Sequence, residues 1–514
     1  MAAPALYYLL LVPLLAIVPF LCLIHCYSWR RTVAPSRLPP SPWALPVIGH
    51  LHHLIGALPH RGMRDLAQRH GPLLLLRLGG LPVVIASSAM AAREVMKTCD
   101  MDLATRPVSR MIRIAIPEGA EGVVFAPYGD TWRLMRKICN VELLSAPRVQ
   151  SFWPLRDDEV GRLLRAVALA ASVQQKQTVN LSKLVAAYAA DFSARAIIGS
   201  RFKERDSFLA MLARGIKLFA KIGLPDLYPC SWLAMVVSRI PGQMKKHKED
   251  ADAFLNSIID EHQQNYRVCG GDKEEDMLDV LLRLQREGGL LRHPLSTDRI
   301  KTIMGDMFAG GSDTAATTLQ WIMAELMRNP RLMHKAQEEI RRELAGQHKV
   351  TEKGLRNLNY MHLVIKEALR LHPPLPLLLP RECQKNCKLL GYHIPKGTMV
   401  LVNAWAINRD PRHWDAPEDF IPERFERSNI DFKGTNFEYT PFGAGRRMCP
   451  GMAFGLVNIE FALAGLLYHF DWELPHDTQA GKLDMAEEMG VTVRRRQDLL
   501  LVPTIRVPLP IDYQ

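Results

Sequence analysis

The stretch Pro441-Phe442-Gly443-Ala444-Gly445-Arg446-Arg447-Met448-Cys449-Pro450-Gly451 sets one cysteine in a loop rich in glycine and proline. An apolar run from Met452 to Leu467 follows directly, and its pattern predicts a helix. The glycines permit backbone turns where side chains would clash, and they let a flat group approach closely. Loop N–H groups and a helix N-terminus lower the pKa of a thiol, so we expect Cys449 to favour the thiolate.

Two side chains near Cys449 indicate what the sulfur binds. Arg447 is suited to pair with an anionic group on the ligand, and Phe442 is an aromatic shield. A thiolate beside a cation and an aromatic ring suits a haem iron, whose macrocycle carries carboxylate side arms. The alternative is a glycine-rich loop with a buried structural cysteine, which is how we interpret the other cysteines of the chain.

The pattern Phe442-x-x-Gly445-x-Arg447-x-Cys449-x-Gly451 resembles the haem-binding signature of the cytochrome P450 monooxygenases at every fixed position. The resemblance covers essentially residues 30–506 and is closest to the plant microsomal, A-type branch. It implies a mainly α fold with a small β region, and haem b ligated by the Cys449 thiolate. It also implies NADPH-dependent monooxygenation with electrons from a separate flavoprotein, the NADPH–cytochrome P450 reductase, and cytochrome b5 as an additional candidate donor. No flavin or dinucleotide fingerprint occurs in the chain itself.

Composition narrows the classes of partner. The net charge of +12 fits an anionic membrane surface or an acidic protein partner. No basic tract with interleaved aromatic residues indicates nucleic-acid binding. Cys383 and Cys387 have no companion His or Cys cluster, so we interpret them as free thiols in a reducing compartment.

The N-terminal segment predicts a membrane anchor. Residues 1–29 contain no Lys, Arg, Asp or Glu, and the part from Leu6 to Ile24 is nearly all apolar, close to the length that a bilayer-spanning helix needs. Basic residues follow from Arg30 onward, so the positive-inside rule predicts a single-pass protein with a cytosolic catalytic domain. The resemblance places such a protein in the endoplasmic reticulum membrane. A cleavable signal peptide is the alternative, but it would have a basic region before its apolar core.

A proline-rich stretch, Leu38-Pro39-Pro40-Ser41-Pro42, predicts a stiff hinge after the anchor. It resembles the hinge of microsomal members of the family, with Ser41 where these usually have glycine. We therefore divide the chain into a membrane signal anchor (1–29), a basic and proline-rich hinge (30–50) and one cytosolic haem-thiolate catalytic domain (51–514).

A second chemical stretch, from Asp306 to Thr318, lies in a helical pattern that runs from about Thr297 to Asn329. Adjacent glycines inside a helix cost about 1 kcal/mol each relative to alanine, which indicates either a groove for a ligand or a close helix crossing. A carboxyl and a hydroxyl beside that groove are suited to relay protons. The stretch resembles the oxygen-activation motif of the family, matched at four positions: Gly310, Gly311, Asp313 and Thr314. Asp313 and Thr314 are thus the expected catalytic residues, while Ala315 departs from the usual Ser or Thr.

Two further sets of residues take their roles from the resemblance. Trp132 and Arg136, one turn apart on a helix that starts near Asp130, and Arg381 after a proline-rich segment are expected to hold the haem propionates. Without the resemblance, the first pair would be read as part of an ordinary amphipathic helix. The second set is expected to form a buried structural ion network: Glu367, Arg370 and Arg424.

The substrate pocket is predicted from apolar residues near these motifs, for each of which core packing is the alternative. The candidates are Met111, Ile114, Val123, Phe125, Met307, Phe308, Gly310, Leu377, Leu378 and Val491. Such a lining favours a small hydrophobic substrate. The resemblance to plant enzymes of terpenoid metabolism predicts oxidation of a sesquiterpenoid or diterpenoid, with a flavonoid or phenylpropanoid as the alternative. A haem-thiolate isomerase or a haem sensor would not need Asp313 and Thr314.

Overall fold

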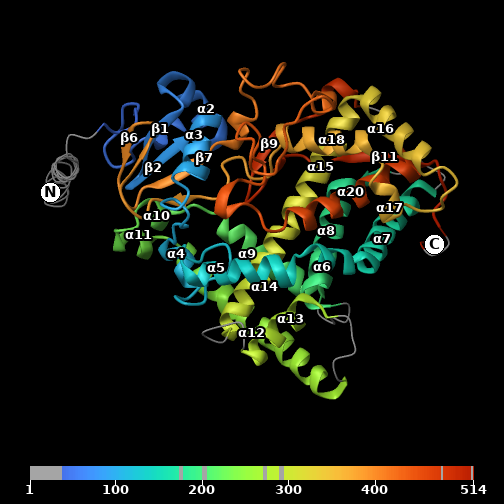
Figure 1. Ribbon diagram of the computed structural model, residues 1–514, viewed down its shortest axis with the longest axis horizontal. Coiled ribbons are helices and arrows are strands. Elements are labelled where there is room, and N and C mark those ends of the chain that lie inside the picture. The colour runs from blue at the N-terminus through green and yellow to red at the C-terminus, as the bar shows by residue number, and fades with distance from the viewer. Residues whose placement is uncertain are drawn as a thin grey trace, which may run out of the picture.

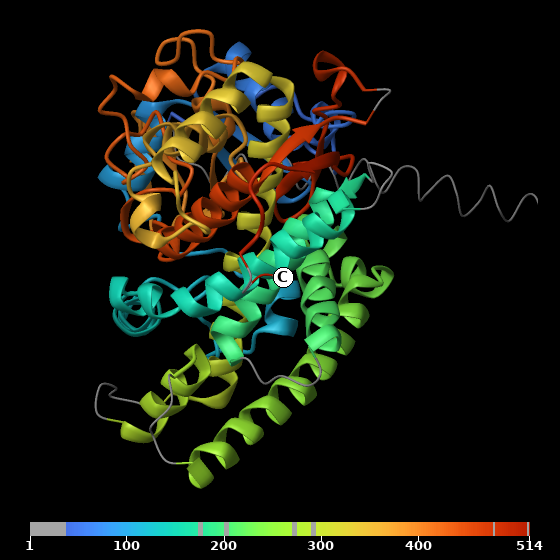
Figure 2. The same ribbon diagram turned by 90° about the vertical axis from the view of Figure 1, so that its right-hand side faces the viewer.

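The computed structural model describes residues 37–172, 178–199, 205–269, 275–288, 295–475, 478–510 and 513. The predicted anchor, residues 1–29, lies outside the described residues. The described part is mainly helical and has a roughly triangular outline, with a β-rich corner, a helical corner near the C-terminus, and α12 and α13 at the third corner (Figure 1). Figure 2 shows α12 as the long helix that reaches away from the body.

Small sheets account for the β structure. The first sheet has the order β1-β2-β7-β4, in which β2 and β7 are parallel and the other pairs antiparallel. The predicted hairpin from Leu73 to Ile85 is confirmed by β1 and β2, which turn at Gly79-Gly80. A second sheet has the order β3-β11-β8, and two hairpins complete the set. The strands are β1 (Leu73–Leu78), β2 (Leu81–Ala86), β3 (Val179–Asn180), β4 (Arg381–Glu382), β5 (Cys387–Leu389), β6 (Tyr392–Ile394), β7 (Met399–Val402), β8 (Phe470–Glu473), β9 (Glu487–Met489), β10 (Val493–Arg495) and β11 (Leu500–Ile505).

Helices form the rest of the body. The N-terminal half contains α2 (Pro59–His70), α3 (Ala89–Arg93), α4 (Arg110–Ala115), α5 (Asp130–Lys137), α6 (Ala146–Ser151), α7 (Trp153–Ser172), α8 (Leu181–Ile198), α9 (Arg205–Phe219), α10 (Leu224–Leu227), α11 (Trp232–Val237) and α12 (Ile240–Cys269). The C-terminal half contains α13 (Met277–Glu287), α14 (Thr297–Gly311), α15 (Asp313–Arg328), α16 (Pro330–Glu343), α17 (Glu352–Leu355), α18 (Asn359–Leu371), α19 (Ala404–Ile407) and α20 (Met452–His469). Short helical turns are η1 (Leu51–His53), η2 (Glu94–Thr98), η3 (Ile138–Leu143), η4 (Pro422–Phe425), η5 (Gly445–Arg447) and η6 (Ala480–Lys482).

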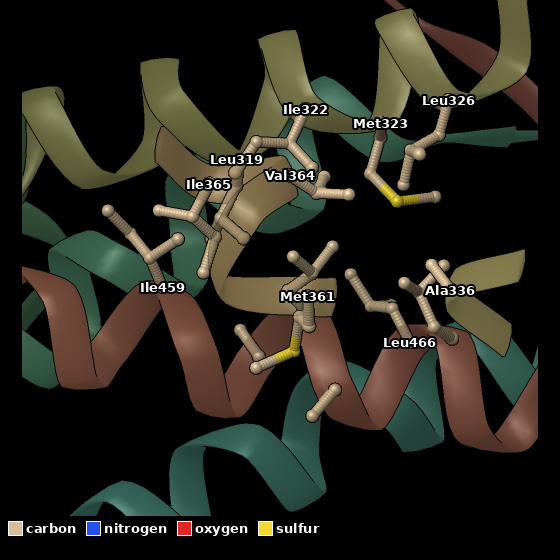
Figure 3. Close-up of a cluster of buried hydrophobic side chains, with 14 of the residues drawn as sticks. Leu319, Ile322, Met323, Leu326, Ala336, Met361, Val364, Ile365, Ile459 and Leu466 are labelled. Atoms are coloured by element: carbon tan, nitrogen blue, oxygen red, sulfur yellow. The ribbon is translucent and has the colours of Figure 1, made fainter. Parts of the chain in front are cut away.

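The largest core cluster lies where α15, α16, α18 and α20 meet. Figure 3 shows Leu319 and Ile322 of α15 facing Met361 and Val364 of α18, with Leu466 of α20 beneath them. All are buried. The helix α20 is apolar on all sides, as expected of a helix that is surrounded by protein. Among the described residues it is the helix long and apolar enough to cross a membrane, but 67% of it is buried inside the body, so it is a core helix.

The predicted long helix around the second motif is divided. Helix α14 ends at Gly311, Ser312 separates it from α15, and α15 ends at Arg328 before Pro330 begins α16. The hydroxyl groups of Ser312 and Thr314 donate to the carbonyl oxygens of Phe308 and Gly310, at 2.8 and 2.7 Å. Such back-bonding by short polar side chains bends helices. The division therefore falls at the glycine pair.

Candidate functional site

A cavity of about 240 Å³ lies between the α14–α15 junction and the 441–451 loop, so the two motifs face each other across it. Most of its lining is apolar, from Met96, Leu144, Ile197, Leu369, Leu375 and Val402 among others. The polar side chains in the lining are few and mostly basic. They include Arg106, Arg136, Arg381, Arg447, Asp306 and Thr314. The site is thus a mainly apolar cavity with positive charge along part of its wall.

The cysteine loop has the tight backbone that its glycines predict. Gly443 and Gly445 have φ values of 68° and 70°, a region that side chains disfavour. A Cβ at Gly445 would lie 2.1 Å from the carbonyl oxygen of Met96, so only glycine fits there. The Cys449 N–H donates to the carbonyl oxygen of Phe442 at 2.9 Å, which closes the loop just before α20. Phe442, Cys449 and Gly451 all line the cavity.

The expected low pKa of the Cys449 thiol is not found in the protein alone. Burial raises the pKa of Cys449, and this outweighs the lowering by the Gly451 N–H and by Arg136. The expectation considered the loop dipoles and left out desolvation, which disfavours the charged form of a buried thiol. A bound metal ion reverses this balance because it deprotonates a coordinating thiol.

Buried guanidinium groups gather beside the cavity. Arg381 pairs with Asp100 at 2.6 Å, whereas Arg106, Arg136 and Arg447 form no ion pair within the described part of the chain. Burial, and then repulsion from Arg381 and Arg136, lowers the pKa of Arg447 to about 9. The guanidinium groups of Arg106, Arg136 and Arg447 donate to backbone carbonyl oxygens. Arg106 donates to Leu379 and Pro380, and Arg136 donates to Met448. Arg447 donates to Ala104, Val123, Val124 and Ala126.

This excess of buried positive charge fits an anionic cofactor. Buried charges are normally paired, so a cluster of guanidinium groups that repel one another needs a counter-anion. A haem carries two carboxylates on one edge, and guanidinium groups bind carboxylates well. The residues present therefore fit a haem whose propionates face this cluster and whose iron faces Cys449.

Arg106 was not identified from the sequence. It is 8% exposed, it lines the cavity, and its Nε lacks a partner in the structure. Burial, together with Arg381 and Arg447, lowers its pKa. The sequence signal was weak, an arginine in the short segment Thr105-Arg106-Pro107 with no spacing to any motif. Only the fold brings this segment to the 441–451 loop.

Both residues of the α5 pair line the cavity. Arg136 donates to the Met448 carbonyl at 2.6 Å. The Trp132 indole N–H instead donates to the Val123 carbonyl at 3.1 Å, and the Arg447 guanidinium stacks 4.6 Å from the ring centre. Trp132 thus holds Arg447 and the loop before α5 in this structure.

The proposed proton-relay residues take different positions. Thr314 lines the cavity, and its hydroxyl donates to Gly310. Asp313 is not in the cavity lining; its Oδ2 accepts a hydrogen bond of 2.6 Å from Thr492, which also contacts Thr317 at 3.0 Å. The segment after β9 therefore holds the Asp313 carboxyl away from the cavity.

Some of the predicted pocket residues line the cavity, and the others lie outside its lining. Val123, Met307, Gly310 and Leu378 line the cavity. The structure places the other candidates outside the lining. Met111 and Ile114 pack with Leu218 and Met244, Phe308 packs against Phe208 in the core, Leu377 packs beneath the first sheet, and Phe125 and Val491 lie elsewhere on their loops.

Helix geometry explains the error at Phe308. Residues three and four positions apart share a helix face, so Met307, Gly310, Gly311 and Thr314 look into the cavity together. Phe308 follows Met307 directly, about 100° further round the helix, and packs against Phe208 in the core, where it is 3% exposed. Its predicted place in the pocket is therefore wrong.

The structure brings the three residues of the predicted ion network together. Arg370 donates from Nε and Nη2 to the two oxygens of Glu367, each at 2.8 Å, and both side chains are fully buried. Arg424 donates to Glu367 Oε1 at 2.9 Å and joins η4 to α18. The remaining donors of Arg370 reach the carbonyl oxygens of Asn408, Pro417 and Asp419. The network thus fixes the 408–424 segment to α18.

Comparison with known proteins identifies close relatives. The family described as Cytochrome P450 matches residues 39–502. The desmethyl-deoxy-podophyllotoxin synthase of Sinopodophyllum hexandrum is 46% identical over 91% of this chain and 92% of its own length. The premnaspirodiene oxygenase of Hyoscyamus muticus is 42% identical over 96% and 98%, and the zealexin A1 synthase of Zea mays is 45% identical over 92% and 93%.

A solved structure supports the fold. A zebrafish cytochrome P450 with progesterone superimposes with a TM-score of 0.74 at 24% identity, covering 88% of this chain and all of the other. At that identity the likeness concerns the fold alone.

Proposed function

The chain belongs to the cytochrome P450 family, and from this premise we propose that it inserts one oxygen atom from O2 into a sesquiterpenoid or diterpenoid of plant specialised metabolism. Members of the family are monooxygenases that hold haem through a cysteine thiolate and take electrons from NADPH through a reductase. Two observations support the substrate class. The cavity lining is predominantly apolar, and the relatives include the premnaspirodiene oxygenase and the zealexin A1 synthase.

The observation that carries the proposed function is that Cys449 and the cluster of buried arginines line the same cavity. We assign Cys449 as the residue whose sulfur would bind the haem iron, and Arg106, Arg136, Arg381 and Arg447 as the residues that would hold the propionates. When bound, the haem supplies the activation of O2, and a thiolate ligand favours O–O cleavage. Phe442 lines the cavity with Cys449, and its ring would shield the sulfur from water and keep it in a low-dielectric environment.

The residues of the α14–α15 junction handle protons and position the substrate. Gly310 leaves open space against the helix, whereas Gly311 lets the helix pack closely against Ser193 and Phe454. Met307 and Val123 offer apolar contacts that exclude water. Thr314 lines the cavity, and its hydroxyl, which donates to the Gly310 carbonyl oxygen in this structure, can pass on one proton while its oxygen accepts another. Asp313 can pass a proton to Thr314 from outside the cavity lining, where the Thr492 hydroxyl holds its carboxyl.

The experiment that tests the assignment is a reduced carbon monoxide spectrum of the full chain in microsomes, for wild type and for Cys449→Ser. We expect the thiolate-type band in wild type and its loss in the variant, because serine cannot replace the thiolate ligand. Cys139→Ser is the control, since Cys139 is also a buried cysteine but does not line the cavity. A thiolate-type band that survives in Cys449→Ser contradicts the assignment.

The substrate is tested by titration of the wild-type Soret band. Terpene olefins, diterpene acids and flavonoids are added separately, and a saturable low-to-high-spin shift with the terpenes alone supports the proposed class. The second candidate, an aromatic flavonoid or phenylpropanoid metabolite, is favoured by the similarity to the desmethyl-deoxy-podophyllotoxin synthase. A shift with flavonoids alone promotes that candidate.

We also propose that the protein is bound to the endoplasmic reticulum membrane, with residues 1–29 as the anchor, residues 30–50 as the hinge and the catalytic domain (51–514) in the cytosol beside its reductase. An exposed apolar patch supports a membrane contact near the hinge. The patch comprises Trp43, Val47, Ile55, Ile222, Trp232, Leu233, Val236 and Val237. The Tyr228 hydroxyl contacts the Val47 carbonyl at 3.3 Å, and Gly80 N–H donates to Leu227 at 2.8 Å, so the hinge, the first sheet and α10–α11 form one corner (Figure 1).

A further inference from the structure

The loop between α4 and α5 closes one side of the cavity through Val123 and Val124. On one side, the Val123 carbonyl oxygen accepts hydrogen bonds from the Trp132 indole at 3.1 Å and from Arg447 Nη1 at 3.0 Å. On the other side, the Val124 N–H donates to Asp306 Oδ2 at 3.1 Å. The backbone of this short segment is therefore fixed between the arginine cluster and α14.

Asp306 is a carboxyl group for which the reaction described above has no use. It lies on α14 one turn before Gly310, and it lines the cavity. Burial raises the pKa of Asp306 to about 7. This effect outweighs the lowering by the N–H groups of Val124 and Val123 and by the charge of Arg447. Burial of this carboxyl group costs desolvation free energy, which indicates that its contacts with the loop have a role in the protein.

Gly122 of the loop leaves room for this carboxyl group. A Cβ at Gly122 would lie 2.2 Å from Asp306 Oδ2 and 3.1 Å from its Cγ. The next nearest atom is Thr302 Cγ2 at 3.2 Å, so the severe conflict would be with the carboxylate. Glycine at position 122 is what allows Asp306 to reach the N–H groups of the loop.

We propose that Asp306 is a positioning residue whose carboxylate clamps the 122–124 backbone to α14. The clamp fixes Val123 and Val124, which form the roof of the substrate cavity, and the carbonyl groups that orient Arg447. The clamp is a contact between two segments of the chain. The proposal rests on the proposed function for one point, that this cavity holds haem and substrate.

The first test measures the clamp itself. Hydrogen–deuterium exchange of the loop peptide 119–126 is compared between wild type and Asp306→Asn, with the haem-loaded full chain in lipid nanodiscs. We expect about tenfold faster exchange in the variant, because the N–H groups of the loop lose a hydrogen bond to a charged acceptor. Asp298→Asn is the matched control, since Asp298 is an exposed carboxylate on the same helix that pairs with Lys301. Equal exchange in wild type and Asp306→Asn overturns the proposal.

The pH dependence of the same exchange is a second readout. A carboxylate accepts N–H groups better than the neutral acid does, so protection of the loop is expected to increase from pH 6 to pH 8 in wild type and not in Asp306→Asn. The groups that face Asp306 are Arg447 from η5 and the Cys139 thiol from η3. Burial raises the pKa of Cys139 to about 12, so this thiol does not titrate in the window. A pH dependence that is the same in both proteins contradicts the clamp.

A double-mutant cycle connects the clamp to the cavity. The probe is 4-phenylimidazole, which ligates the iron and also fills space beneath the roof, with imidazole as the small reference ligand. We expect Gly122→Ala to weaken 4-phenylimidazole binding about tenfold in wild type, and less than about twofold in the Asp306→Ala background, where the carboxylate is absent. Equal losses in both backgrounds overturn the proposal.

The reduced carbon monoxide spectrum and the exchange of the loop together separate failure of the clamp from failure of the proposed function. If wild type shows no thiolate-type spectrum, the assignment of Cys449 fails, but the exchange of the loop still reports on Asp306. If the spectrum is normal in wild type and Asp306→Asn while the loop exchanges equally in both, the clamp alone is wrong.

Discussion

Arg106 shows how a single buried charge can act in opposite directions on the haem-free and haem-loaded protein. Without a counter-anion it lies near two other cations, Arg381 and Arg447, and all three have pKa values lowered mainly by burial. With a propionate present, the same charge becomes a partner. Its contribution to stability therefore depends on the cofactor.

We predict that Arg106→Gln raises the thermal unfolding midpoint of the haem-free protein and speeds haem loss from the loaded protein about tenfold, because a charge-assisted hydrogen bond is lost. Haem transfer to apomyoglobin measures the loss, and calorimetry measures the midpoint. Arg110→Gln, at an exposed site at the start of α4, is the control. A variant that lowers the unfolding midpoint of the haem-free protein and also speeds haem loss would show that Arg106 is only structural.

Thr492 is the residue through which the 490–493 segment holds Asp313. We predict that Thr492→Val lowers the yield of oxidised product per NADPH consumed by about fivefold, because the carboxyl loses a hydrogen bond and its fixed position. Product and NADPH are measured in parallel. Thr492→Ser keeps the hydroxyl and should restore the yield; if serine and valine behave alike, the hydroxyl has no part in proton delivery.

At the scale of elements, the contact between α12 and α13 is sensitive to pH. His262 of α12 lies 3.1 Å from Asp276, which caps α13, and this carboxylate raises the pKa of His262 to about 9 despite the opposing effect of burial. The pKa in the folded state is thus above the ordinary value of 6.5. The stabilisation is fully present below about pH 6.5 and is lost as the pH rises towards 9.

We predict that His262→Gln lowers the free energy of unfolding by about 1–3 kcal/mol at pH 6, and that the difference from wild type disappears near pH 9.5. Urea unfolding followed by circular dichroism at both pH values measures it. His334→Gln, which removes an exposed histidine paired with Glu338 on α16, is the control. A constant difference at both pH values would exclude the ion pair as its cause.

At the scale of the whole molecule, the exposed patch around α11 lies at the same corner as the hinge (Figure 1). Trp232 and Val236 are 72% and 71% exposed, one turn apart on one face of the helix. Large apolar side chains that are exposed together on one helix face mark a contact with a membrane or a partner.

We predict that the protein without residues 1–29 still binds phospholipid vesicles, and that the double variant Trp232→Glu, Val236→Glu reduces this binding at least about tenfold because it removes buried apolar area. Vesicle sedimentation measures the bound fraction. Val141→Glu changes an isolated exposed apolar residue on η3 and should have little effect. Unchanged binding of the double variant would exclude the patch as the membrane contact.

The sequence by itself determined the family, the cysteine loop and the order of the motifs. These features are local, because glycine, proline and cysteine at fixed spacing dictate a backbone and a chemistry wherever the chain goes. The hairpin at 73–85 and the helix after Cys449 were predictable for the same reason, since they depend on the periodicity of neighbouring residues.

Only the tertiary structure decided which distant groups share the cavity. Arg106 and Gly122 carry no local signal, and the stretch that begins at Asp306 gave no sign that this carboxyl contacts the 122–124 loop. Contacts between segments far apart in the chain bring Arg106 and Asp306 into the cavity lining and place Gly122 against Asp306. The same holds for the turn of Asp313 towards Thr492, and for Phe308, which faces the core. Burial also reversed the expected pKa of Cys449, because the cost of desolvation depends on everything packed around a group and not on its neighbours in the sequence.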